Sequence, residues 1–185
     1  MGVLWKSHFR GEVPVNMHQT LPFVRNEHGH HVLEVEGVDW TGQEELARPE
    51  LMVRGSAREL LSMPDYDLKH YLKRRIYRVA LIHWSELSDR PFAERTSANY
   101  LAHGLGFGYQ QSRAGLQPRL HDLLAGQLMG QGYYCAALHE PILVESQLTL
   151  LYSRQYPDGW TLTTDSGNPS HEWHDPGWFA LEIPE

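Results

Sequence analysis

The sequence is poor in cysteine, and Cys135 is its only one. A single cysteine cannot form an intrachain disulfide, so the fold cannot depend on the disulfide framework that small secreted domains use. Cys135 stands in the apolar run of residues 133–138, which predicts a buried structural thiol and not a catalytic nucleophile. Because a chain without disulfides suits a reducing compartment, we expect a cytoplasmic protein.

Long hydrophobic runs are also missing. The longest aliphatic stretches, such as residues 79–82, are far shorter than the ~20 apolar residues of a membrane-spanning helix. The first residues lack the basic region and the apolar stretch of a secretory signal. These absences predict a soluble protein without a membrane partner.

Complete catalytic motifs are absent from the sequence as well. No serine stands in a G-x-S-x-G nucleophile elbow, and no lysine completes a Walker A motif. Gly104, Gly106 and Gly108 form a G-x-G-x-G run that lacks the last spacing of the dinucleotide fingerprint. The motifs therefore leave open whether the protein is an enzyme.

The composition, in contrast, is that of an ordinary globular protein. The chain has 185 residues, of which 41% are hydrophobic and 21% are charged. These values argue against disorder and against a coiled coil, and a chain of this length can bury a core of its own. We expect one domain covering residues 1–185.

Strand signals occur near both ends of the chain. Residues 22–25 and 31–36 flank Gly29, whose freedom to adopt a positive φ suits a tight connection, and they predict a β-hairpin. Residues 142–152 and 160–164 flank a strong turn signal and predict a second hairpin. A last strand is expected over residues 178–183.

Helical signals fill the middle of the sequence. Two capping boxes, at residues 41–44 and 56–59, predict short helices. Longer helices are predicted over residues 65–87, 91–111 and 118–129. An N-terminal hairpin region, central helices and C-terminal antiparallel strands together predict an α+β fold.

The charges are distributed unevenly along the chain. The formal net charge is −7, composed of −4 over residues 1–50, +5 over residues 51–120 and −8 over residues 121–185. The helix predicted over residues 65–87 carries much of the positive charge, which makes it a candidate site for a protein partner or a phosphate. Its basic residues are Lys69, Lys73, Arg74, Arg75 and Arg78.

This charge pattern supports two interpretations. In one, the basic helix pairs with the acidic ends of the same chain; in the other, it contacts a protein partner or a nucleic acid. Six tryptophans and nine tyrosines add aromatic groups of the kind that protein interfaces favour. The leading hypothesis is a binding, adaptor or regulatory protein that acts by recognition through a basic helix and acidic, aromatic-rich ends.

Histidines are frequent, and a first group of them could hold a divalent transition metal. On a strand His28 and His30 would face the same way, and Glu34 could add an oxygen ligand. The H-x-H-x3-E spacing of these residues is similar to part of the first cupin motif, over seven residues only. The glycines that frame that motif are absent and the helical middle does not suit a cupin barrel, so no family is assigned.

A second histidine group lies near the C-terminus. His171 and His174 alternate with carboxylates in a turn-rich segment, where they could form a metal site or a general acid/base pair. An exposed polar loop is the simpler interpretation of both groups. The alternative functions are therefore a metal-dependent enzyme with a His/Glu site and a nucleic-acid-binding subunit of a complex.

Overall fold

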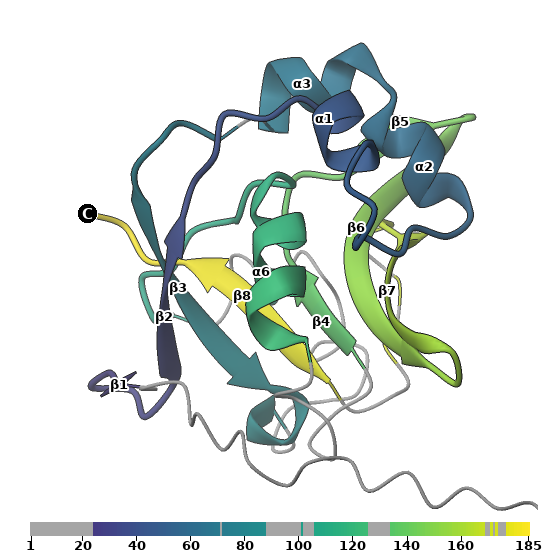
Figure 1. The fold of residues 1–185 in the computed structure, drawn as a ribbon. Coiled ribbons are helices and arrows are strands. Elements are labelled where there is room, and N and C mark those ends of the chain that lie inside the picture. The colour runs from purple at the N-terminus through teal and green to yellow at the C-terminus, as the bar shows by residue number, and fades with distance from the viewer. Residues whose placement is uncertain are drawn as a thin grey trace, which may run out of the picture.

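A curved sheet built from both ends of the chain organises the protein (Figure 1). The computed structural model describes residues 24–70, 72–87, 101, 106–125, 134–168, 171, 173 and 177–185. These residues form an eight-stranded sheet in the order β1-β2-β3-β8-β4-β6-β5, with β7 paired to the other edge of β6. The sheet and its helices make one mixed α+β unit, and no helix within the described residues has the length and apolar character needed to cross a membrane.

The N-terminal hairpin consists of β1 (Val24–Arg25) and β2 (His31–Glu36), which pair antiparallel as the sequence predicts. Gly29 adopts a φ of 82° in the connection. The side-chain oxygen of Asn26 accepts hydrogen bonds from the backbone N–H groups of His28 and His30. A glycine and an asparagine therefore fix the turn locally.

Three short helices follow: α1 (Gly42–Leu46), α2 (Ser56–Leu61) and α3 (Pro64–His70). The capping box that begins at Thr41 is confirmed, because Thr41 and Glu44 satisfy each other's backbone N–H groups. The second predicted capping box is wrong. Gly55 occupies the N-cap of α2, and the hydroxyl of Ser56 instead contacts the hydroxyl of Thr164 on β7 at 2.5 Å.

The long amphipathic helix predicted over residues 65–87 is not formed. Helix α3 ends at His70, and β3 (Ile76–His83) and a short 3-10 helix (Trp84–Leu87) follow. Tyr77, Val79 and Leu81 alternate along β3 and pack under α6, while β2 and β8 satisfy the backbone of β3 on both edges. Pairing on two edges and a β-branched, aromatic composition outweigh the helical periodicity.

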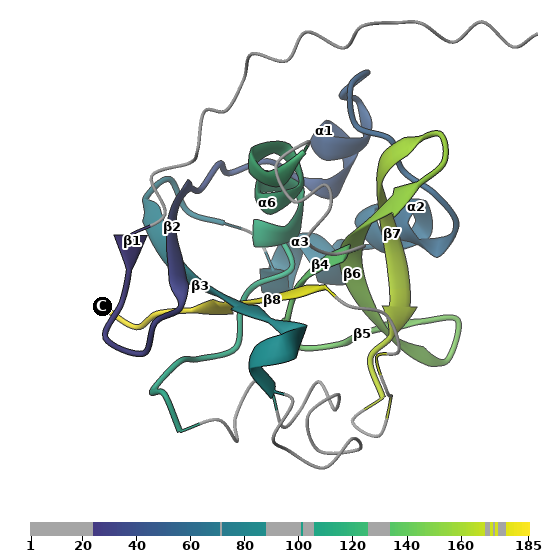
Figure 2. The same cartoon turned by 90° about the horizontal axis from the view of Figure 1, so that it is seen from below.

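The last strand joins the two halves of the sheet. Strand β8 (Trp178–Glu182) runs antiparallel to β3 and parallel to β4 (Tyr134–Ala137), so the C-terminal strand lies in the middle of the sheet. Figures 1 and 2 both show β8 between β3 and β4. A strand distant in sequence thus supplies the central contact, which local patterns cannot reveal.

Helix α6 (Leu116–Leu124) covers one face of this sheet (Figure 2). It begins two residues before the predicted start, and Pro118 is tolerated because it stands in the first turn. Leu116, Leu120 and Leu124 are fully buried against β2, β3 and β4. Residues 126–129 of the predicted helix lie outside the described residues.

The helix predicted over residues 91–111 falls mostly outside the described residues. Its described C-terminal part, residues 106–111, is not helical, and Gln110 forms a β-bridge with Glu182. Phe107 and Tyr109 pack on the second face of the sheet, opposite α6. The buried partners on that face include Tyr134, Tyr152, Trp173 and Phe179.

The C-terminal strand predicted over residues 142–152 is divided in two. Glu145 and Ser146 take positive φ values of 46° and 70°, and they separate β5 (Ile142–Val144) from β6 (Gln147–Tyr156). The predicted hairpin between β6 and β7 (Gly159–Ser166) is present, with Leu151 opposite Thr164. The structure therefore contains two successive hairpins where the sequence pattern indicated one.

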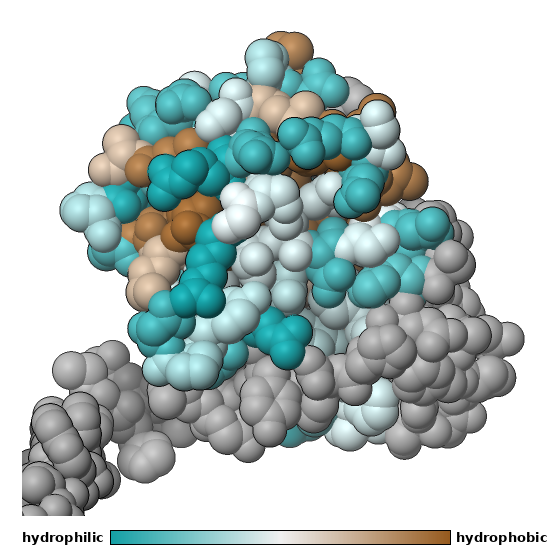
Figure 3. All heavy atoms as spheres, turned by 90° about the vertical axis from the view of Figure 1, so that its right-hand side faces the viewer, coloured by the Kyte–Doolittle hydropathy of each residue, from teal (hydrophilic) through white to brown (hydrophobic). Residues whose placement is uncertain are grey.

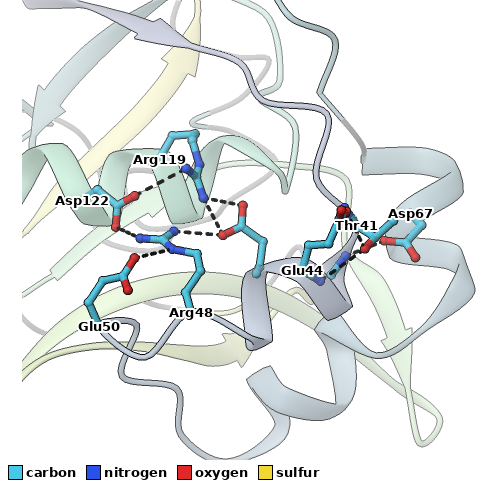
Figure 4. Close-up of polar contacts among 9 residues, drawn as sticks. Thr41, Glu44, Arg48, Glu50, Asp67, Arg119 and Asp122 are labelled. Carbon is cyan, nitrogen blue, oxygen red and sulfur yellow. Dashed lines mark hydrogen bonds and ion pairs between the residues drawn. The ribbon is translucent and has the colours of Figure 1, made fainter.

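A buried ion-pair network attaches α1 to α6 (Figure 4). The carboxylate of Glu45 binds Arg119 from α6 and Arg48, and Asp122 contacts the same two guanidinium groups. Both arginines also lie over the ring of Trp40, at 5.7 and 4.8 Å from its centroid. These contacts position α6 on the sheet and use Arg119 of the basic region, together with Arg48 of the N-terminal region, internally.

Candidate functional site

The outer edge of β2 is only partly covered. Strand β1 pairs with His31 and Val32, and no strand within the described residues pairs with the outer edge of residues 33–36. Figure 1 shows β1 beside one end of β2, with the rest of β2 at the margin of the sheet. An uncovered edge presents backbone groups that another chain can bind.

The register defines which backbone groups face outward. Gly37 donates its N–H to the carbonyl of Arg75. In an antiparallel pair every second residue is hydrogen-bonded to the neighbouring strand, so Val35 and Leu33 also form their backbone hydrogen bonds with β3. The N–H and C=O groups of Glu34 and Glu36 consequently point away from β3. Within residues 33–36, these are the backbone groups that an added strand would bind.

Two hollows share Glu34 and Arg78, and we call them together the β2 edge groove. The first lies at this edge, and the second lies over β3 and the end of β8, on the inner side of β2. The first has a volume of about 460 Å³ and the second about 310 Å³, and both are lined by Glu34 and Arg78. The first is lined further by Val24, Arg25, Asn26, Val32, Leu33 and Leu123. The second is lined further by Arg75, Ile76, Tyr77, Glu182, Ile183 and Glu185.

The β2 edge groove combines exposed apolar and charged side chains. Val24 is 68% exposed and Ile76 is 53% exposed, which is unusual for aliphatic residues of a sheet. Glu34 lies directly opposite Arg78, and Glu36 lies opposite Ile76. Glu34, Glu36 and Arg78 form no ion pair with another described residue, so their charges face solvent.

The five basic residues expected on one helix are dispersed. The backbone of Lys69 belongs to α3, Lys73, Arg74 and Arg75 precede β3, and Arg78 is on β3. The shared helix is therefore a wrong prediction, because the chain changes from helix to strand within this segment. Only Arg75 and Arg78 line the β2 edge groove.

Internal pairing neutralises part of this basic segment. Arg74 donates to Asp39 at 2.9 Å and, through this hydrogen bond, lowers the pKa of the Asp39 carboxyl. Arg75 contacts Glu185 and lies 3.6 Å from Glu182 near the C-terminus. Arg74 and Arg75 thus pair with acidic residues of both ends of the chain, as the first interpretation of the charge pattern expects.

The structure brings His28 and His30 together and leaves Glu34 apart. The two imidazole centroids are 6.1 Å apart, and both rings contact Phe107. Glu34 follows His30 by four residues, or about 13 Å along an extended chain. No group of three or more metal-ligating side chains occurs within the described ranges, which exclude His174.

His30 connects a carboxylate to a phenol at the end of the hairpin. Its Nδ1 lies 2.8 Å from the Tyr109 hydroxyl, and its Nε2 lies 3.5 Å from Glu86. Burial lowers the pKa of His30, which favours the neutral imidazole, and burial raises the pKa of Tyr109. The amide of Asn26 also donates to this hydroxyl, so the group anchors the hairpin and fixes the direction of β2.

His171 lies on another side of the molecule, next to a larger polar hollow. Its Nε2 is 3.4 Å from Asp165, which lines a cavity of about 710 Å³ with Ser56, Ser146, Thr164 and other polar residues. Figure 3 shows this side, where hydrophobic residues form separate patches among hydrophilic ones. This hollow leaves no local signal in the sequence, because its lining comes from α2, the turn between β5 and β6, β6, β7 and Asn168.

A histidine, a serine and the cysteine meet in the core beneath α6. His121 Nδ1 lies 3.0 Å from the Ser153 hydroxyl, and Ser153 stands opposite Cys135 in the sheet. Burial raises the pKa of Cys135 to about 12 and lowers the pKa of His121 to about 4. Gln117 binds both strands beneath the helix. A neutral thiol and a buried imidazole make this a structural network.

No protein-family model, no curated protein and no solved structure matches this chain. Its function must therefore be inferred from its own residues. The apolar part of the β2 edge groove was missed by the sequence analysis, because Leu33 and Leu123 are ordinary core residues in the pattern. The exposed glutamates of β2 were the one available signal, since they alternate with buried residues.

Proposed function

We propose that this protein acts by recognition and binds an extended segment of a partner protein along the β2 edge groove. The segment adds to the sheet next to β2, beyond the point where β1 ends. Strand addition of this kind takes affinity from backbone hydrogen bonds and specificity from alternate side chains. The protein is then an adaptor or regulatory component, and the segment is its ligand.

One observation carries the proposal: Glu34 and Glu36 direct their backbone groups away from β3, and Glu34 lines a hollow whose apolar lining is Val24, Val32, Leu33 and Leu123. Two residues offer two donors and two acceptors, and each hydrogen bond contributes about 1 kcal/mol net. The hollow adds burial of an apolar side chain against Leu33 and Leu123. Together these contributions suit a reversible peptide contact.

The sequence that precedes β1 is poorly suited to continue this ladder. Asn26 donates its N–H to the carbonyl of His30. The next hydrogen-bonded pair between β1 and β2 is therefore Val24 with Val32. The next such position, opposite Glu34, would belong to residue 22, which is proline and has no N–H to donate. At that position a proline would leave the carbonyl of Glu34 without a donor, whereas another chain can supply one.

The experiment uses short random peptides displayed on phage and selected on the full-length protein. Enriched peptides are synthesised with a single N-methyl group at successive backbone positions. Strand addition predicts that N-methylation at alternate positions, those facing Glu34 and Glu36, lowers affinity at least about tenfold. N-methylation at the intervening positions is the matched control and leaves affinity unchanged.

Amide exchange gives an independent readout of the same contact. The N–H groups of Glu34 and Glu36 should exchange more slowly when an enriched peptide is bound, because they gain acceptors. Failure to enrich any peptide, or binding that no N-methyl position weakens, would overturn the proposal.

The two alternative functions stay predictions. A metal-dependent enzyme would use His28, His30, Glu34, His171 and His174, and a nucleic-acid-binding subunit would use the basic segment. Arg78 is exposed and has no ion pair with a described residue, and this observation supports the second alternative, although Arg74 and Arg75 are paired. Native mass spectrometry of the protein from its own host distinguishes all three, since it reports bound metal, nucleic acid and protein partner together.

A further inference from the structure

We infer that the segment bound at the β2 edge groove carries a basic residue, an apolar residue and a second basic residue in succession. This inference rests on the proposed function and specifies the chemistry of its ligand. Three features of β2 support it: the spacing of its two exposed carboxylates, the apolar face that Leu33 and Val35 form, and the repulsion that disfavours a second copy.

The spacing of the carboxylates matches alternate residues of an added strand. Glu34 and Glu36 are exposed on the same face of β2, about 7 Å apart along the strand. Residues i and i+2 of a paired peptide have the same spacing and lie opposite them. Because both glutamates lack an ion pair with a described residue, two lysines or arginines at these positions would complete the charge pairing.

The residue between the two basic positions points to the other face. That face of β2 is formed by Leu33 and Val35, and the hollow beside it includes Leu123 of α6. Charge at this position would be desolvated against aliphatic groups without a partner. An aliphatic or aromatic side chain is therefore expected there.

Arg78 opposes a basic ligand, and distance decides which charge dominates. A basic side chain opposite Glu34 lies about 5 Å from it, whereas Arg78 is one strand further, at about 10 Å. At about 10 Å salt screens an exposed interaction substantially. The nearer attraction to Glu34 therefore outweighs the repulsion from Arg78.

A second copy of this chain does not fit the same edge. Antiparallel pairing of two β2 edges would place the carboxylates of Glu34 and Glu36 opposite their own counterparts. Like charges directly opposite each other destabilise a sheet, and charged edge residues commonly prevent self-association. The two glutamates thus reject identical chains and accept a basic segment.

The experiment compares selection of the same displayed peptide library on three forms of the full-length protein. Wild type should enrich peptides with the basic, apolar, basic pattern. The double variant Glu34→Gln, Glu36→Gln should bind these peptides about tenfold more weakly, a change of about 1.4 kcal/mol. Glu59→Gln, an exposed glutamate on α2, is the matched control and should leave binding unchanged.

A charge-reversal variant provides the decisive test of the charge pairing. Glu34→Lys, Glu36→Lys should enrich acidic, apolar, acidic peptides, a result that loss of folding cannot produce. If wild type enriches peptides with the alternating N-methyl response but without basic residues, this inference is wrong and the proposed function stands. If the reversed variant still selects basic peptides, the inference is equally overturned.

Discussion

Glu34 on β2 lies directly opposite Arg78 on β3, and both side chains line the two adjoining hollows of the β2 edge groove. Other arginines are engaged within the fold, since Arg48 and Arg119 bind the buried carboxylate of Glu45. The charges of this protein therefore divide into a set that holds the fold together and a set that faces outward at one sheet edge. Different experiments test the two sets.

Replacing Glu45 by glutamine should destabilise the protein strongly. Its side chain is 4% exposed, and the change leaves Arg119 and Arg48 without their shared buried counterion. Breaking a buried pair in this way costs about 3 kcal/mol, to be measured as the free energy of unfolding in urea. Asp158→Asn is the control, because its pair with Arg54 is exposed and its loss should cost less than about 1 kcal/mol.

Gly42→Ala should also destabilise the protein, although alanine is the better helix former. In an exposed helix the change would stabilise by about 1 kcal/mol. Here a Cβ at the buried Gly42 would overlap the carbonyl of Leu61, so overpacking should reverse the sign and cost about 2 kcal/mol. Both variants are compared by thermal unfolding. Gln43→Ala, at the exposed position next to Gly42, is the control and should leave the melting temperature nearly unchanged. A rise in melting temperature for Gly42→Ala would contradict the observed packing.

The stability of the protein should fall as the pH decreases from 6.5 to 4. Burial lowers the pKa of His121 from 6.5 to about 4. Between these pH values the imidazole is protonated in the unfolded chain and neutral in the folded chain, so a falling pH favours unfolding. The stabilising contribution of neutral His121 is complete above pH 6.5 and is lost towards pH 4, by up to about 3 kcal/mol.

The variant His121→Asn isolates this contribution. Asparagine can retain the contact with Ser153 but does not titrate, so its free energy of unfolding should vary less between pH 6.5 and 4. Gln43→Ala is the control, because this exposed side chain does not titrate and the variant should show the pH dependence of wild type. An identical slope for wild type and His121→Asn would refute the assignment.

Cys135 should resist thiol reagents until the protein unfolds. Its side chain is fully buried, and burial raises the pKa of the thiol to about 12. Since the thiolate is the reacting species, labelling by a disulfide reagent at pH 8 should be at least about 100-fold slower in the native protein than in denaturant. Rapid native labelling would show that the network beneath α6 opens readily.

Local signals in the sequence predicted several elements correctly. The connection at Gly29, the turn before Gly159 and the capping box at Thr41 depend on residues close in sequence, so their patterns are sufficient. The prediction of residues 65–87 failed because a helix and a buried strand can share the same apolar residues. Tertiary pairing with β2 and β8 selected the strand.

The candidate site was accessible to sequence reasoning only in part. His28, His30 and Glu34 were singled out, yet the structure separates Glu34 from the imidazoles and places it beside Arg78. The hollow near it needs Leu123, which comes from a helix about 90 residues further along the chain. Contacts of this kind follow from packing and leave no local pattern.

The sequence by itself determined the globular α+β class, the tight turns and the impossibility of an internal disulfide, because these depend on composition and on neighbouring residues. Only the tertiary structure decided that the basic segment becomes a strand, that Arg74 and Arg75 pair with the acidic ends, and that residues 33–36 of β2 have no outer strand partner among the described residues. The physical reason is that backbone pairing and charge pairing act between segments distant in the chain. Which of them meet is decided when the sheet assembles.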